Sequence, residues 1–226
     1  MKRFDPSSIR AMVFDFDGTL AATNIDFALM RAEVLEVAAR WGLREHVDGS
    51  RYILEIVAQI IELLPDDDAR GRFHEDAEAA MQRVELVASQ AAEPFPGVPE
   101  ALQSLLDAGL RVGVITRNCR LGVAAGMERR PIPHEVLLTR DDVDFVKPHP
   151  SHLHLALDAL GVSPDCGLMV GDHITDIETG HSAGVHAVGV LTTNTTRAQF
   201  EECGAEFVAD AVPEVVATVL RSLGEE

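Results

Sequence analysis

One nine-residue stretch, MVFDFDGTL at residues 12–20, constrains this chain more than any other. Its first residues are apolar, and a short apolar run bounded by turn residues predicts a buried strand of a parallel sheet. Asp15 and Asp17 follow, and then come Gly18 and Thr19. Because open α/β sheets place their ligands at the carboxyl ends of strands, the two carboxylates are candidates for a functional site.

Two kinds of chemistry suit this pair of carboxylates. Two Asp side chains at one site repel each other, and both stay ionised if a hard cation such as Mg²⁺ lies between them. An Asp side chain can also attack phosphorus and form an aspartyl phosphate. An EF-hand calcium loop is excluded, because its sixth position is Gly and counting from Asp15 gives Leu20. A polar turn after a strand is the alternative.

The second half of the chain alternates between strand and helix patterns. Apolar runs of strand length occur at 111–115, 135–138, 168–170, 186–190 and 207–209. Helical patterns lie between them, at about 100–108, 121–127, 151–160 and 175–183, and a last helix opens at Pro213. This alternation predicts an α/β fold, a Rossmann-like parallel sheet with helices on both faces.

The intervening segment, residues 22–93, shows only helical patterns. Apolar residues recur at helical spacing in three runs that end near Gly42, Pro65 and Pro94. We therefore expect an inserted all-helical cap domain at 22–93 and a core domain made of 1–21 and 94–226.

Two further polar stretches follow predicted strands. Thr116, Arg117 and Asn118 end the strand at 111–115, where a hydroxyl and backbone N–H groups at a helix start suit a phosphate. A simple helix cap is the alternative for Thr116. Lys147 stands before a proline and is one of only two lysines in the chain, so it is a candidate for a positioned charge; an ordinary surface lysine is the alternative.

A last polar stretch, at Gly171 and Asp172, follows the strand at 168–170, and Asp176 comes four residues later near a helix start. Helix capping is the alternative role for Asp176. Three histidines, 149, 152 and 154, cluster near another helix start. We expect them to be solvated, since no Cys or carboxylate completes a metal site.

Together, the four stretches resemble in order and position the four motifs of the haloacid dehalogenase superfamily. The first, DFDGT at 15–19, resembles the Asp-x-Asp-Gly-Thr of its phosphatase branch. The helical insertion after this motif resembles the C1-type cap of phosphoglycolate phosphatase-like members. His173 departs from the pattern, because the family usually has a small hydroxyl residue there.

The resemblance implies a role for each motif residue. It implies that Asp15 is the nucleophile, Asp17 the general acid and base, and Thr116 and Lys147 the groups that stabilise the phosphoryl oxygens. It implies a phosphate site at Gly18, Thr116, Arg117, Asn118 and Lys147. It also implies that Mg²⁺ is held by Asp15, Asp172 and the backbone carbonyl of Asp17, with Asp176 in support.

Several branches of the superfamily fit the sequence less well. The haloacid dehalogenase branch lacks the second Asp, which is present here as Asp17. Phosphonoacetaldehyde hydrolases use a cap lysine, and residues 22–93 contain none. Sugar-phosphate mutases use a His just after the first motif, and residues 20–30 contain none. The remaining expectation is a Mg²⁺-dependent phosphatase, with a mutase or a non-catalytic small-molecule-binding module as the alternatives.

Composition limits the partners. The formal net charge of −18 opposes binding to nucleic acid or anionic membranes. Three distant cysteines suggest neither a disulfide framework nor a zinc site, and the N-terminus does not resemble a signal peptide. We expect a cytoplasmic protein without a membrane anchor, a monomer or homodimer, whose partner is a small phosphorylated metabolite.

Overall fold

The computed structural model describes residues 4–224, and the chain divides into two compact units. The first consists of Met1–Thr23 and Ala92–Glu226, and the second is Asn24–Ala91. The sequence predicted the inserted unit at 22–93, and in the structure it is two residues shorter at each end. The Ala22 N–H donates to the Glu93 carbonyl, and Ala21 forms a β-bridge with Pro94. Because of these contacts, both segments that connect the units belong to the first unit.

The first unit contains a six-stranded parallel sheet with the order β3-β2-β1-β4-β5-β6. Its strands are β1 (Ala11–Phe14), β2 (Arg111–Ile115), β3 (Val136–Leu138), β4 (Gly167–Gly171), β5 (His186–Val190) and β6 (Val208–Ala209). Every residue of β1 is buried, because the strand lies between β2 and β4 and is covered on both faces. The α/β fold expected from the alternating pattern is thus confirmed.

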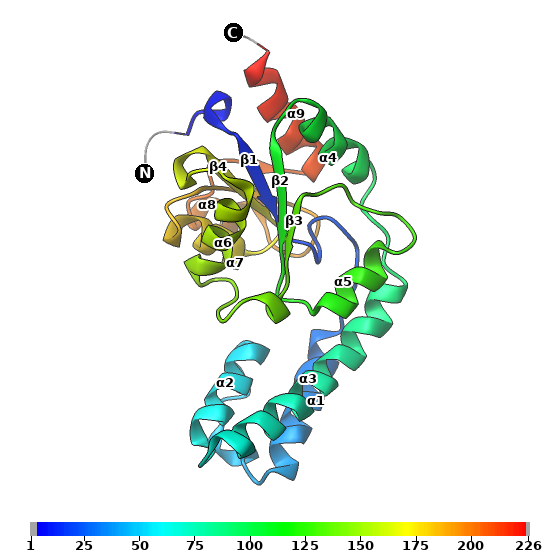
Figure 1. Ribbon diagram of the computed structural model, residues 1–226, viewed down its shortest axis with the longest axis vertical. Helices are drawn as coiled ribbons and strands as arrows, with labels where there is room; N and C mark the ends of the chain where they lie inside the picture. The colour runs from blue at the N-terminus through cyan, green and yellow to red at the C-terminus, as the bar shows by residue number, and fades with distance from the viewer. Residues whose placement is uncertain (1–3, 225–226) are drawn as a thin grey trace. The chain divides into compact units, whose positions relative to one another are not determined.

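Helices cover both faces of the sheet, as Figure 1 shows for the first unit. On one face, Met12 and Phe14 pack with apolar residues of α4 (Val98–Asp107) and α9 (Val212–Leu223). On the other face, Ala11 and Val13 pack with residues of α6 (Pro150–Leu160), α7 (Ile174–Ser182) and α8 (Arg197–Glu202). Successive side chains of a strand point to opposite faces of the sheet, so neighbouring residues of β1 pack in different hydrophobic cores. A further helix, α5 (Arg120–Met127), follows β2.

Two local predictions need correction. The helix predicted at about 151–160 begins at Pro150, and His149 is its N-cap, where its Nδ1 accepts a hydrogen bond from the Ser151 N–H. The helix α8 was not predicted, although Thr196 and Gln199 form a capping box at its start. Six residues are too few to show a helical period.

The second unit is built from α1 (Phe27–Arg40), α2 (Ile53–Leu63) and α3 (Asp67–Gln90). Asp26 and Asp66 cap the first and third helices by accepting backbone N–H groups. The apolar faces of the three helices form one core around Phe73, which is fully buried and meets Trp41 edge-on. Within residues 4–224, no helix is both long and apolar enough to cross a membrane.

Candidate active site

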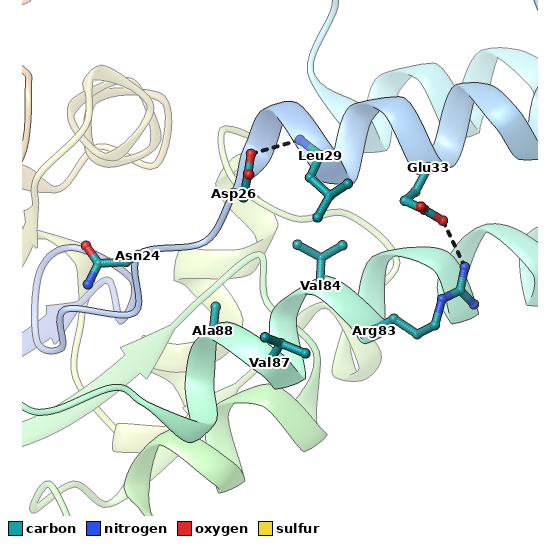
Figure 2. A pocket seen from close by; sticks show the side chains of 8 residues that line it. All are labelled: Asn24, Asp26, Leu29, Glu33, Arg83, Val84, Val87 and Ala88. Atoms are coloured by element: carbon teal, nitrogen blue, oxygen red, sulfur yellow. Dashed lines mark hydrogen bonds and ion pairs between the residues drawn. The ribbon is translucent and has the colours of Figure 1, made fainter.

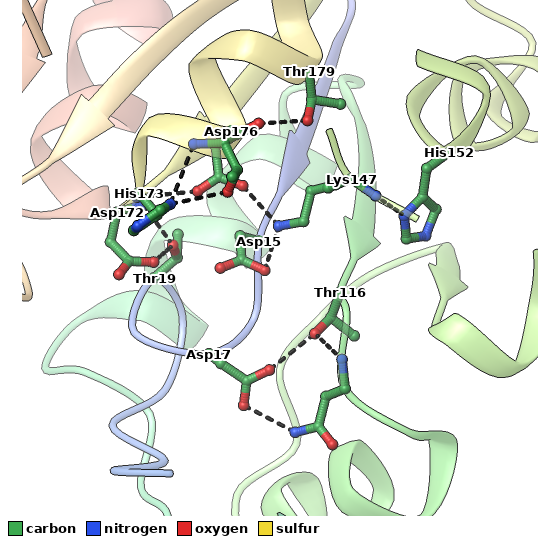
Figure 3. Close-up of polar contacts among 12 residues, drawn as sticks. Asp15, Asp17, Thr19, Thr116, Lys147, His152, Asp172, His173, Asp176 and Thr179 are labelled. Carbon is green, nitrogen blue, oxygen red and sulfur yellow. Dashed lines mark hydrogen bonds and ion pairs between the residues drawn. The ribbon is translucent and has the colours of Figure 1, made fainter. Parts of the chain in front are cut away.

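The polar site lies at the carboxyl ends of the two central strands. Asp15 follows β1 and Asp172 follows β4, and the register pairs Phe14 with Val170. The Asp15 N–H donates to the Val170 carbonyl at 2.9 Å, which extends this pairing by one residue. The two carboxylates therefore lie side by side, and both are buried (Figure 3).

Lys147 joins the carboxylates from the loop before α6. Its Nζ lies 2.6 Å from Asp15 Oδ1 and 2.7 Å from Asp176 Oδ1, and only 3% of the side chain is exposed. Burial alone would lower the pKa of Lys147, but the charges of Asp15 and Asp176 outweigh it and hold the pKa above its usual value. The ammonium group is therefore a fixed positive charge beside Asp15.

Two threonine hydroxyls hold the Asp172 carboxylate. Thr19 Oγ1 donates to Oδ1 and Thr193 Oγ1 donates to Oδ2, each at 2.7 Å. The Asp172 N–H in turn donates to Thr19 Oγ1 at 3.0 Å. Burial and the nearby charge of Asp15 raise the pKa of Asp172 to about 7, against the opposing effect of these hydroxyls. The carboxylate is oriented by the protein but crowded by like charge.

Asp15, Asp172 and Asp176 form a group that could hold a metal ion, since one carboxylate oxygen of each lies within 4.8 Å of the others. All three are buried, and Lys147 supplies one positive charge to the three carboxylates. Hard oxygen donors with excess negative charge are what Mg²⁺ prefers. The residues present therefore fit this ion.

Two glycines allow the chain to come this close. Gly18 has a φ of +86°, and a Cβ there would lie 2.6 Å from Asp172 Oδ2. A Cβ at Gly171 would lie 2.1 Å from Asp176 Cγ. Real Cβ atoms do not approach other atoms so closely, so both positions require glycine.

Asp17 points away from the group of three and toward the end of β2. Its Oδ2 accepts a hydrogen bond from Thr116 Oγ1 and its Oδ1 accepts one from Asn118 Nδ2, each at 2.9 Å. Burial of the carboxyl group and the charge of Asp15 raise the pKa of Asp17 to about 6, and these hydrogen bonds oppose the rise. A carboxyl group in this setting can exchange a proton near neutral pH.

The structure also places the residues expected to bind phosphate. Thr116 and Asn118 are buried, and the Asn118 N–H donates to Thr116 Oγ1 at 3.0 Å. The Gly18 N–H donates to the Ala21 carbonyl, and the Arg117 carbonyl accepts from Arg140 Nη1. Thr116 and Asn118 thus lie beside Asp17, while the Gly18 N–H is already engaged within its own turn.

His173 has a structural role in this fold. It is the N-cap of α7, where its Nδ1 accepts from the Thr175 N–H at 3.2 Å and its own N–H donates to Asp176 Oδ2 at 3.1 Å. A small hydroxyl residue could supply the same cap. His173 therefore keeps the helix cap and the backbone hydrogen bond to Asp176, although the family usually has a small hydroxyl residue at this position.

Sequence reasoning missed two residues of this region. Thr193 lies in the loop after β5, and the rule that sites form at strand ends could have found it. His152 was expected to be solvated, which is wrong, because its side chain is fully buried. Its Nδ1 accepts from the Lys147 N–H at 3.3 Å, and this contact depends on how α6 packs on the sheet. The 3.6-residue spacing could have placed it on the face of Leu153 and Ala156.

The second unit contains a cavity of its own, of about 290 Å³, between α1 and α3 (Figure 2). Leu29, Val84, Val87 and Ala88 form its apolar wall. An ion pair closes one side, with Arg83 Nη2 3.1 Å from Glu33 Oε2.

Comparison with known proteins adds the family context. A sequence profile of haloacid dehalogenase-like hydrolases matches residues 12–190. Pyrophosphatase PpaX of Bacillus mycoides (strain KBAB4) is 29% identical over 223 residues, covering 96% of this chain and 99% of that protein.

Solved structures show the same fold. CbbY from Rhodobacter sphaeroides, in complex with phosphate, matches with a TM-score of 0.63 at 24% identity, covering 92% of this chain and 96% of that one. A predicted phosphoglycolate phosphatase from Haemophilus somnus 129pt matches with a TM-score of 0.63 at 17% identity, covering 93% and 98%.

Proposed function

The chain belongs to the haloacid dehalogenase-like hydrolases, and on that premise we propose that it is a Mg²⁺-dependent phosphatase. Its substrate is a small phosphate monoester, and the reaction passes through an aspartyl phosphate on Asp15. One observation carries the proposal: Lys147 Nζ lies 2.6 Å from Asp15 Oδ1 in a buried group of three carboxylates. That arrangement places the Asp15 carboxylate beside a fixed positive charge that can also neutralise a bound phosphate.

The metal requirement rests on the donor set. Asp15 and Asp172 would supply carboxylate oxygens, the backbone carbonyl of Asp17 would supply the third donor that the family resemblance implies, and Asp176 would support the group through its ion pair with Lys147. When bound, Mg²⁺ offsets the negative charge of the phosphate and of the crowded carboxylates. The raised pKa of Asp172 reflects the same crowding.

The protein's own side chains carry the chemical steps. An Asp15 oxygen attacks phosphorus in line and forms the phosphorus–oxygen bond, while the bond to the leaving oxygen breaks. Asp17 gives its proton to that oxygen. In the second step Asp17 takes a proton from water, the water oxygen attacks phosphorus, and Asp15 is released with inorganic phosphate. Lys147 and Thr116 stabilise the phosphoryl oxygens as negative charge develops.

The contacts of Asp17 fit its proposed role as the general acid and base. Its carboxylate is held by Thr116 and Asn118 and lies apart from the group of three. When a phosphoryl group arrives, the Thr116 hydroxyl can turn from Asp17 to a phosphate oxygen. The same movement leaves Asp17 available to the leaving group.

The size of the substrate follows from the organisation of the chain. The helical unit, Asn24–Ala91, is inserted directly after the first motif, and its resemblance to a C1-type cap implies that it serves as the cap of the enzyme. Such a cap favours a small metabolite over a macromolecule. The name of the PpaX relative makes inorganic pyrophosphate a second substrate to include in any assay.

A panel of small phosphate esters and pyrophosphate, assayed with purified protein in Mg²⁺, tests the proposal. Turnover should need Mg²⁺ and should be inhibited by Ca²⁺, which is larger and accepts looser coordination. Full activity after exhaustive EDTA treatment would contradict the metal requirement. Product that keeps its phosphate on another carbon would indicate a mutase, and no turnover of any compound would favour a binding module.

A further inference from the structure

One buried side chain near the site has no part in the chemistry described so far. His152 lies on α6 with none of its surface exposed. Its Nδ1 accepts the backbone N–H of Lys147 at 3.3 Å, and its Nε2 lies 3.1 Å from the carbonyl oxygen of Leu138. The imidazole thus bridges the loop that carries Lys147 and the end of β3.

The same Leu138 carbonyl also anchors the other side of the phosphate site. The Thr116 N–H donates to it at 3.0 Å. Thr116 and Lys147 are therefore attached to one oxygen atom, Thr116 directly and Lys147 through the imidazole. The ring therefore links the backbones of Lys147 and Thr116, the two residues proposed to contact the same phosphoryl group.

The contacts define the tautomer. An Nδ1 that accepts from a backbone N–H carries no proton, so Nε2 carries the proton and donates it to the carbonyl. Burial and the positive charge of Lys147 favour this neutral ring, and the carboxylates of Asp15 and Asp142 oppose them more weakly.

The neighbours of His152 show that burial alone does not explain a histidine here. The adjacent inward positions of α6 are Leu153, Ala156 and Leu157, which are apolar and pack into the core. A polar ring at such a position is unfavourable unless both nitrogens are bonded. Here both are bonded, one to the backbone of Lys147.

We propose that His152 is a positioning residue, which ties the backbone of Lys147 to the Leu138 carbonyl and so fixes Lys147 relative to Thr116. The inference rests on the proposed phosphatase function. Lys147 makes contacts of 2.6 and 2.7 Å to Asp15 and Asp176, and a small displacement of its backbone lengthens both. A misplacement of about 1 Å can lower turnover about 10²-fold.

Three variants test the proposal. His152→Leu removes both hydrogen bonds and keeps the apolar bulk. His152→Asn keeps an acceptor, its amide oxygen, near the Lys147 N–H. Leu153→Ala is the matched control, because it opens a cavity in the same helix without touching Lys147.

We expect His152→Leu to lower kcat about 10- to 100-fold and to weaken binding of orthovanadate, a phosphate mimic, by about 10-fold. His152→Asn should recover most of both losses. Leu153→Ala should lose stability but keep kcat and vanadate affinity within about 2-fold of the wild type, since the ligand contacts are intact. Equal losses in His152→Leu and Leu153→Ala, or no recovery in His152→Asn, would overturn the proposal.

A spectroscopic measurement separates this inference from the proposed function. The ¹H–¹⁵N resonance of the Lys147 amide reports its hydrogen bond to the imidazole without any turnover. It should move in His152→Leu and remain close to the wild-type position in Leu153→Ala. If no phosphate compound is turned over but the Lys147 amide behaves in this way, the phosphatase proposal fails and the positioning of Lys147 stands. An unchanged Lys147 amide in a folded His152→Leu protein contradicts the positioning.

Discussion

Replacing His152 with Leu should change how the stability of the protein depends on pH. Burial and the charge of Lys147 lower the pKa of His152 to about 4, below the ordinary value of 6.5. The unfolded chain therefore binds a proton at His152 more readily than the folded chain does. The stability that comes from the neutral ring is complete above about pH 6.5 and is lost as the pH falls toward about 4.

The size of this effect follows from the two pKa values. The difference of about 2.5 units corresponds to about 3 kcal/mol in total, and about 2 kcal/mol of it is lost between about pH 7.5 and pH 5. The raised pKa values of Asp17 and Asp172 act in the opposite direction, because the folded state favours their protonated forms. Asp17 and Asp172 are present in both the wild type and His152→Leu. The difference between the two free energies of unfolding therefore does not contain their contribution.

Urea unfolding of wild type and His152→Leu at several pH values, with EDTA to remove bound metal, measures the difference. The wild type should lose about 2 kcal/mol more than the variant between about pH 7.5 and pH 5. Leu153→Ala should be less stable than the wild type by the same amount at every pH. Parallel stability curves for wild type and His152→Leu would refute the shifted pKa of the imidazole.

Three further outcomes follow from the contacts of the site. Thr193→Val removes a hydroxyl that holds Asp172, so the Kd for Mg²⁺ measured by calorimetry should rise about 10-fold, while Thr193→Ser should stay near wild type. Asp17→Asn should lower turnover by roughly 10²–10⁴-fold, yet an aryl phosphate with a good leaving group should still phosphorylate the enzyme, which then releases phosphate slowly. Gly171→Ala should lower the free energy of unfolding by about 1–3 kcal/mol, because the new methyl group overlaps Asp176; a urea midpoint equal to that of wild type would contradict the close approach.

The sheet was predictable from sequence because its strands are short, apolar and buried on both faces. The runs at 111–115 and 186–190 match β2 and β5 residue for residue. The placement of site residues at strand ends followed from the same pattern, since parallel strands bring their carboxyl ends to one edge. Asp15 and Asp172 come together for this reason.

Contacts that depend on tertiary packing were not predictable. Helical spacing could place His152 on the buried face of α6, but its contact with the Lys147 backbone depends on how α6 lies on β2 and β3. Thr193 reaches Asp172 across 21 positions of sequence, through the conformation of a loop. The hydrogen bond between Asp17 and Asn118 also connects two strand ends. The sequence could identify both residues but not predict this contact between them.

The central claim is that phosphate passes through Asp15, and trapping the intermediate tests it most directly. The enzyme is mixed with a small phosphate ester and Mg²⁺, quenched within milliseconds in acid and digested with trypsin for mass spectrometry. The phosphoryl group should lie on Asp15 in the peptide Ala11–Arg31, should accumulate in Asp17→Asn and should be absent from Asp15→Asn. Phosphate on a His or Ser, or an Asp15→Asn enzyme that turns over substrate without deamidation, would contradict the account.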